Sequence, residues 1–167
     1  MLNLYVMRHS KSSWNEHNIN DFERPLSKRG MKDIKLIIAF LKKKKITFDL
    51  AYVSSSKRTK QTFKILKNDI HSKKIIYSKK FYLCSESFIL NTIRKTKKKY
   101  KNILIVNHEP CCKNLVLKLI KKNKLSFINK KFSTSAIAKL AFSIEDWESL
   151  KNYSGNLTLF KTPKDFY

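Results

Sequence analysis

Four residues of this sequence carry groups that can bind an oxyanion or attack its central atom, and each residue follows a predicted strand. Arg8 and His9 come directly after the first strand, at the N-terminus of the chain. Arg58 lies in the first turn of the helix after the second strand, and His108 follows a later, strongly apolar strand. In an open α/β sheet, the loops beyond the carboxyl ends of the strands meet at one crevice. We therefore expect two guanidinium groups and two imidazoles to form one site.

The chemistry of these groups predicts transfer of a phosphoryl group through a covalent intermediate. A histidine with a pKa near 6.5 is largely neutral at pH 7, so His9 can attack phosphorus with an unprotonated nitrogen. Its other ring nitrogen should then donate to a nearby backbone carbonyl. Arg8 and Arg58 can each fork onto phosphoryl oxygens, and His108 can donate a further hydrogen bond. One Arg–His pair alone is typical of a protein surface, so the prediction depends on the shared position at strand ends.

Segments with strand and helix patterns alternate along the chain. The clearest helix follows Ser27, a typical N-cap, and has Ile34, Ile37 and Leu41 at helical spacing. The clearest strand covers 102–106, where four consecutive apolar residues are typical of a central strand buried on both faces. The predicted strands are 2–7, 48–53, 75–77, 102–106, 136–142 and 157–160, and the predicted helices are 28–43, 57–68, 85–98 and 110–122.

This alternation predicts an α/β fold of three layers, with a mostly parallel central sheet and helices on both faces. The length of 167 residues suits a single domain over residues 1–167.

The charge of the chain is strongly basic, with 37 Lys and Arg against 12 Asp and Glu, for a net charge of +25. Such a charge can indicate a nucleic-acid partner. Proteins that read nucleic acid rely on the bidentate arginine fork, but only five of these basic residues are arginines and 32 are lysines. We therefore interpret the charge as a Lys-rich composition spread over solvated faces. It should still attract dianionic substrates, less so at high salt.

The three cysteines predict the compartment. Cys111 and Cys112 are adjacent, Cys84 is far away, and no Cys-x-x-Cys pair occurs, so neither a disulfide framework nor a zinc site is indicated. A reducing cytoplasm fits these cysteines best. The sequence has no cluster of carboxylates that could hold a metal, so we expect no metal or other cofactor. The segment before Arg8 is too short for a signal peptide. The longest aliphatic run, 36–41, is far below the roughly 20 residues that cross a bilayer, so we expect no membrane partner.

Four blocks of the chain resemble the motifs of the histidine phosphatase (phosphoglycerate mutase-like) superfamily. They occur in that family's order and together cover the chain to about residue 122. Each block alone is weak, but the combination is specific. Residues 8–15 resemble the Arg-His-Gly signature, 24–30 the Pro-Leu-Thr-x-x-Gly segment, 54–62 the Ser-Pro-x-x-Arg-x-x-Gln-Thr block and 106–110 the Gly-His-x-Pro block.

The blocks depart from the family pattern at three positions without losing a charged group. Ser10 and Asn107 stand where the family has Gly, and Ser55 stands where it has Pro. Within this family, the chain resembles most closely the SixA-type phosphohistidine phosphatase branch. The resemblance lies in its short length, its Arg-His-x-Lys-Ser-Ser-Trp motif and the segment 131–134.

The resemblance implies a phosphoglycerate mutase-like fold, with the two arginines and two histidines named above as the catalytic set. It also implies that Ser12 and Asn15 contact the substrate, although either residue type would suit loop capping as well. Relatives that cleave phosphate esters often place a proton-donating Glu after the third strand. Glu86 and Glu109 are the candidates here, but acidic residues are favoured at helix starts in any case.

We therefore expect a phosphatase that forms phosphohistidine on His9 and dephosphorylates phosphohistidine on a protein partner of the histidine phosphotransfer type. A phosphohistidine leaves as imidazole, which is far less basic than an alkoxide, and so needs less help from an acid. The alternative enzyme is a phosphatase for small phosphorylated molecules. The alternative outside enzymes is a module that binds phosphate or nucleic acid without turnover.

Overall fold

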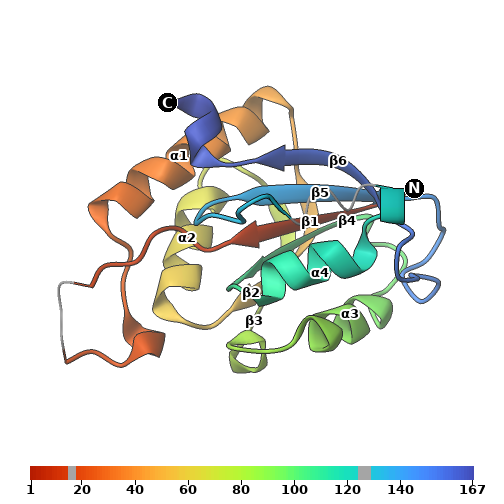
Figure 1. Ribbon diagram of the computed structural model, residues 1–167, viewed down its shortest axis with the longest axis horizontal. Coiled ribbons are helices and arrows are strands. Elements are labelled where there is room, and N and C mark those ends of the chain that lie inside the picture. Colours follow the sequence, from red (N-terminus) through yellow and green to blue (C-terminus); the bar gives the residue numbers. More distant parts are fainter. Residues whose placement is uncertain (15–17, 124–128) are drawn as a thin grey trace.

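The computed structural model describes residues 1–14, 18–123 and 129–167. Within these ranges the chain forms a central sheet flanked by helices (Figure 1). None of the described helices is both long and apolar enough to cross a membrane. The strands are β1 (Leu2–Arg8), β2 (Phe48–Ser54), β3 (Ser72–Ser78), β4 (Asn102–Asn107), β5 (Ile137–Phe142) and β6 (Asn156–Lys161); the α-helices are α1 (Lys28–Lys43), α2 (Lys57–Lys67), α3 (Glu86–Arg94) and α4 (Cys111–Leu119); and short 3₁₀ helices are η1 (Asp21–Glu23), η2 (Lys79–Phe81) and η4 (Pro163–Phe166).

The described strands form one six-stranded sheet in the order β3-β2-β4-β1-β5-β6. β1, β2, β3 and β4 are parallel, whereas β5 is antiparallel to β1 and β6 is antiparallel to β5. The predicted mostly parallel sheet is thereby confirmed. β6 runs in the direction of β1, so its carboxyl end lies at the same edge of the sheet as those of β1, β2 and β4, and β5 begins at that edge.

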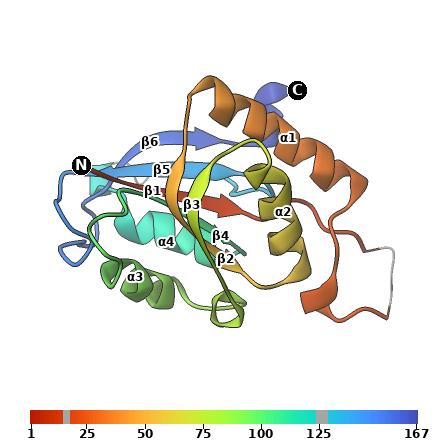
Figure 2. The ribbon, with the colours of Figure 1, turned by 180° about the vertical axis from the view of Figure 1, so that it is seen from behind.

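Helices cover both faces of the sheet, which confirms the predicted three layers. One buried cluster joins α1 and α2 to one face, and a second joins α3 and α4 to the other. Figure 2 shows the sheet from behind, with α2 in front of it. β4 lies between β2 and β1, and its apolar residues from Ile103 to Val106 are all buried, as the sequence pattern predicts.

α1 has the predicted bounds because its start is capped and its inner face is apolar. The Ser27 hydroxyl accepts a hydrogen bond from the Gly30 amide at 3.0 Å. Ile34, Ile37 and Leu41 are fully buried. A side chain at Gly30 would meet the backbone oxygen of Lys11 at 2.2 Å. Glycine is therefore required where α1 crosses the loop that follows β1.

Other boundaries differ from the prediction. α3 ends at Arg94 rather than at 98, and α4 ends at Leu119 rather than at 122. Ile120 leaves the helical conformation to form a β-bridge with Gly155, a tertiary contact without a local sequence signal. β3 is longer than the predicted 75–77 because it pairs along the whole of β2. Its polar residues suit an edge strand, whose outer side faces solvent.

Candidate active site

The four predicted site residues lie together at the carboxyl edge of the sheet. Arg8 ends β1 and His9 follows it; His108 follows β4, and Arg58 lies in the first turn of α2. The ring centroids of His9 and His108 are 5.1 Å apart. Arg58 lies between the rings, with Nε 3.4 Å from His9 Nε2 and Nη2 3.3 Å from His108 Nδ1. All four side chains line a cavity of about 310 Å³.

The His9 ring is held with its Nε2 nitrogen unprotonated. Its Nδ1 lies 2.7 Å from the carbonyl oxygen of Ser10. A carbonyl only accepts, so Nδ1 carries the proton and Nε2 keeps its lone pair towards Arg58. Burial lowers the pKa of His9 to about 3, with the charges of His108, Arg58 and Arg8 acting in the same direction and the bond to Ser10 opposing them. The ring is therefore neutral at pH 7 and can act as a nucleophile.

The His108 ring is held in the opposite tautomer. Its Nδ1 faces Arg58, which can only donate, so the proton resides on Nε2 and is donated to the Ser54 hydroxyl at 2.9 Å. Burial lowers the pKa of His108 to about 3, the Arg58 charge adds to this effect, and Asp21 opposes it. The nitrogen that faces Arg58 is thus an acceptor. For His108 Nδ1 to donate to a phosphoryl oxygen, it must gain a proton, either from the ligand or by a change of tautomer in which the Ser54 hydroxyl donates to Nε2.

Asp21, at the start of η1, binds the guanidinium group of Arg58. Its Oδ2 lies 2.9 Å from Arg58 Nη2 and accepts from the Tyr82 hydroxyl at 2.6 Å, while Oδ1 lies 3.0 Å from Arg24 Nη1. Arg58 Nη1 also donates to the backbone carbonyl of Asp21. Burial opposes ionisation of this carboxyl, but the hydrogen bonds from Tyr82, Arg58 and Arg24 outweigh it and hold the pKa of Asp21 well below its usual range. A carboxylate thus occupies donors that a phosphoryl group would need.

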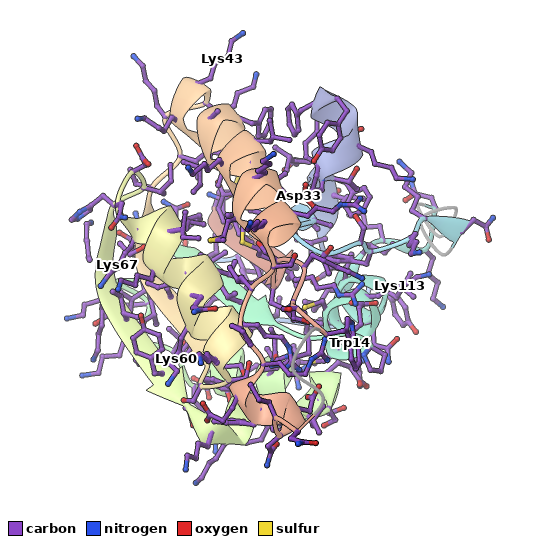
Figure 3. All side chains as sticks on the ribbon, turned by 90° about the vertical axis from the view of Figure 1, so that its left-hand side faces the viewer. Trp14, Asp33, Lys43, Lys60, Lys67 and Lys113 are labelled. Carbon is purple, nitrogen blue, oxygen red and sulfur yellow. The ribbon has the colours of Figure 1, made fainter. Side chains whose placement is uncertain are left out.

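Arg24 organises the loop that follows His9. It is buried, and it donates to the Ser12 hydroxyl at 2.7 Å and to the Ser13 carbonyl at 3.1 Å. Its guanidinium carbon lies 3.2 Å from the centroid of the Trp14 ring. Trp14 is largely exposed and lines the cavity, and Figure 3 shows it at the end of the molecule where the strands finish.

Sequence reasoning assigned no function to Asp21 or Arg24. Two signals pointed to them: Arg24 is one of only five arginines, and Asp21 is one of few acidic residues in a very basic chain.

The segment before β5 borders the site on the side where β5 pairs with β1. Arg8 Nη1 donates to the carbonyl of Phe132 at 2.9 Å. The Ser135 amide donates to the carbonyl of His9 at 3.1 Å, and its hydroxyl donates to the Ser10 hydroxyl at 2.7 Å. The Ser10 side chain is therefore accommodated by a matching serine.

The remaining predicted residues are placed differently. Ser12 lines the cavity, whereas Asn15 lies outside the described residues. Glu109 also lines the cavity; burial raises its pKa, and the amide of Lys113, 3.0 Å from the carboxyl oxygen, opposes the rise. Glu86 does not line it, and its carboxylate lies 3.2 Å from Lys118 Nζ.

The chain is similar to known proteins in sequence and in fold. The sequence model of the Histidine phosphatase superfamily (branch 1) matches residues 4–81. The uncharacterized protein Rv1276c of Mycobacterium tuberculosis is 26% identical over 163 residues, which cover 95% of this chain and 100% of that protein. Among solved structures, the protein histidine phosphatase SixA complexed with tungstate has a TM-score of 0.83 at 21% identity, covering 99% of this chain and 100% of that one. A protein described as SixA from Nakamurella multipartitia has a TM-score of 0.82 at 20% identity, covering 97% and 96%.

The fold is that of the phosphoglycerate mutase-like histidine phosphatases. Residues 4–81 thus match the histidine phosphatase family model, and the chain shares the architecture of the SixA structures over nearly its whole length.

Proposed function

We propose that this protein is a phosphohistidine phosphatase that takes the phosphoryl group of a protein phosphohistidine onto Nε2 of His9. The observation that carries the proposal is the bond between His9 Nδ1 and the Ser10 carbonyl, which leaves Nε2 unprotonated inside a cavity lined by cations. The fold shared with a protein histidine phosphatase complexed with tungstate supports the same class of substrate. The partner would be a cytoplasmic protein of the histidine phosphotransfer type.

Two displacements complete the reaction. In the first, His9 Nε2 bonds to phosphorus as the bond from phosphorus to the substrate imidazole breaks, and the leaving nitrogen keeps the electron pair and takes up a proton from solvent water. In the second, water attacks phosphorus, Nε2 leaves with its electron pair, and the proton of the water leaves with the phosphate. Arg8 and Arg58 balance the charge on the equatorial oxygens in both steps.

A second activity, hydrolysis of small phosphate esters, is favoured by the position of Glu109. This half-buried carboxyl lines the cavity, and burial raises its pKa. A carboxyl group with a raised pKa suits donation of a proton to a leaving alkoxide. Imidazole is a weaker base than an alkoxide and has less need of such a donor. The two activities should therefore differ in their dependence on Glu109.

A phosphoprotein that carries ³²P on histidine tests both points. Incubation with the wild-type protein should release phosphate and leave transient label on His9, and that label should be labile to acid and stable to alkali. His9→Ala should lose turnover by about 10³-fold or more. Glu109→Gln should lower the hydrolysis of alkyl phosphates by about tenfold or more and change phosphohistidine turnover by less than about threefold. Full activity of His9→Ala would refute the proposal, and equal losses in Glu109→Gln would refute the division of roles.

A further inference from the structure

A second cavity, which we call the accessory cavity, opens beside the catalytic one. It has a volume of about 340 Å³ and shares Arg8, Lys11 and Thr134 with the catalytic cavity. Among the described residues that line it there is no Asp or Glu. Its further cations are Arg29, Lys131 and Lys164.

The sheet topology explains why these cations meet. β6 runs in the same direction as β1, so Lys164, in η4 after β6, lies at the edge of the sheet that carries the catalytic site. Lys131 precedes β5, which begins at that same edge. Arg29 belongs to the first turn of α1, which packs on the backbone of Lys11 through Gly30. The accessory cavity is thus a consequence of the fold rather than of one basic run.

The positive charge of the accessory cavity is almost uncompensated. Arg29 lies 3.7 Å from a carboxylate oxygen of Asp33. Within the described parts of the chain, no ion pair involves Lys11, Lys131 or Lys164. Cations held close together without counter-charges repel one another, and an anion bound between them relieves the repulsion.

We propose that the accessory cavity binds an acidic side chain of the protein substrate while the phosphohistidine occupies the catalytic cavity. This rests on the proposed function. Lys11, Lys131 and Lys164 are exposed and come from separate segments, so a partner surface can reach all of them. Ammonium groups act as point charges without a fixed fork, which suits carboxylates that arrive in varied geometry. The net charge of +25 would attract an acidic partner to the protein, and the cations that line the accessory cavity would favour this face.

A pair of phosphohistidine peptides tests the proposal, one with Asp and Glu flanking the phosphohistidine and one with Asn and Gln instead. The wild-type protein should prefer the acidic peptide in kcat/KM. K131A/K164A should lose about 3- to 30-fold of that preference, with unchanged turnover of the neutral peptide. The control is K43A/K67A, which removes the same charge from exposed residues that line neither cavity. Lys43 lies about 21 Å along α1 from Arg29, and Figure 3 shows both control lysines away from Trp14.

The control variant should keep the full preference. Equal losses in both double variants would reduce the effect to the general field and overturn the proposal, as would a wild-type protein without any preference. Inorganic triphosphate serves as a competing probe. If its inhibition depends on Lys131 and Lys164 while the peptide preference does not, the assignment to protein carboxylates is wrong.

A binding arm separates this proposal from the proposed function. Calorimetry with the unphosphorylated acidic and neutral peptides needs no turnover. A wild-type protein that hydrolyses neither peptide would refute the proposed function. Tighter binding of the acidic peptide, lost only in K131A/K164A, would still support the accessory site, and equal binding of the two peptides would overturn it.

Discussion

The buried, neutral state of His9 and His108 makes the fold sensitive to acid over a defined range of pH. Their exposed fractions are 7% and 3%, and burial lowers the pKa of each ring to about 3. In the unfolded chain each ring should titrate near the ordinary 6.5. Between these values the unfolded state binds more protons than the folded state, so stability is lost as the pH falls below about 6.5. From pH 7 to pH 5, each ring should lower the free energy of unfolding by roughly 2 kcal/mol.

Urea denaturation at pH 7, 6 and 5, at constant ionic strength, measures this loss. The two rings together should remove roughly 4 kcal/mol, with a slope that approaches two protons per molecule at pH 5. His108→Asn should reduce the slope to about one proton, because it removes one of the two buried rings in the described part of the chain. The exposed His71 offers the matched control, and His71→Asn should leave the slope unchanged. The lowered pKa of Asp21 acts only below about pH 4, outside this range.

Two results would contradict this prediction of acid sensitivity. A free energy of unfolding that stays constant from pH 7 to pH 5 would show that the rings are not buried in the neutral form. A full two-proton slope in His108→Asn would show that other groups cause the loss. Either result would also remove the reason for expecting an unprotonated nucleophile on His9.

Two further substitutions test the contacts around the site. Asp21→Asn should bind inorganic phosphate about three- to tenfold more tightly by calorimetry. The reason is that the Asp21 carboxylate both competes for Arg58 and repels the anion. Weaker binding by Asp21→Asn would instead show that Asp21 is needed to hold that guanidinium in place. Gly30→Ala should lower the free energy of unfolding by about 1–3 kcal/mol or more, because its Cβ would meet the Lys11 backbone at 2.2 Å. It should also weaken phosphate binding by displacing the loop after His9, whereas Lys32→Ala, at an exposed position of the same helix, should do neither.

Local signals in the sequence were sufficient for much of the fold. α1 has both a serine cap and a regular apolar face, and its bounds match the prediction. β4 is apolar without interruption and lies within the sheet, buried on both sides. The end of α4 could not be predicted in the same way. It depends on the bridge between Ile120 and Gly155, which are 35 positions apart in the chain.

The residues of the site also differ in whether the sequence could predict their position. Arg8, His9, Arg58 and His108 could be grouped because strand ends in a parallel sheet share one edge. Asp21 could not, because its loop has no periodic pattern. That loop is brought over the site by contacts between distant residues, among them the close approach of Gly30 to the Lys11 backbone and the bridge between Ser12 and Leu26.

The arrangement of charge also bears on which form of phosphate the site should accept. Asp21 neutralises Arg58, and His108 offers an acceptor towards that guanidinium. A fully deprotonated phosphoryl group would replace the Asp21 charge but would place an oxygen against the lone pair of His108. A phosphoryl group that carries one proton can donate it to His108 Nδ1, and the imidazolium that forms then donates back to the ligand. A proton that enters with the ligand would thus turn His108 from an acceptor into a donor towards the phosphoryl oxygens, which carry the negative charge during transfer.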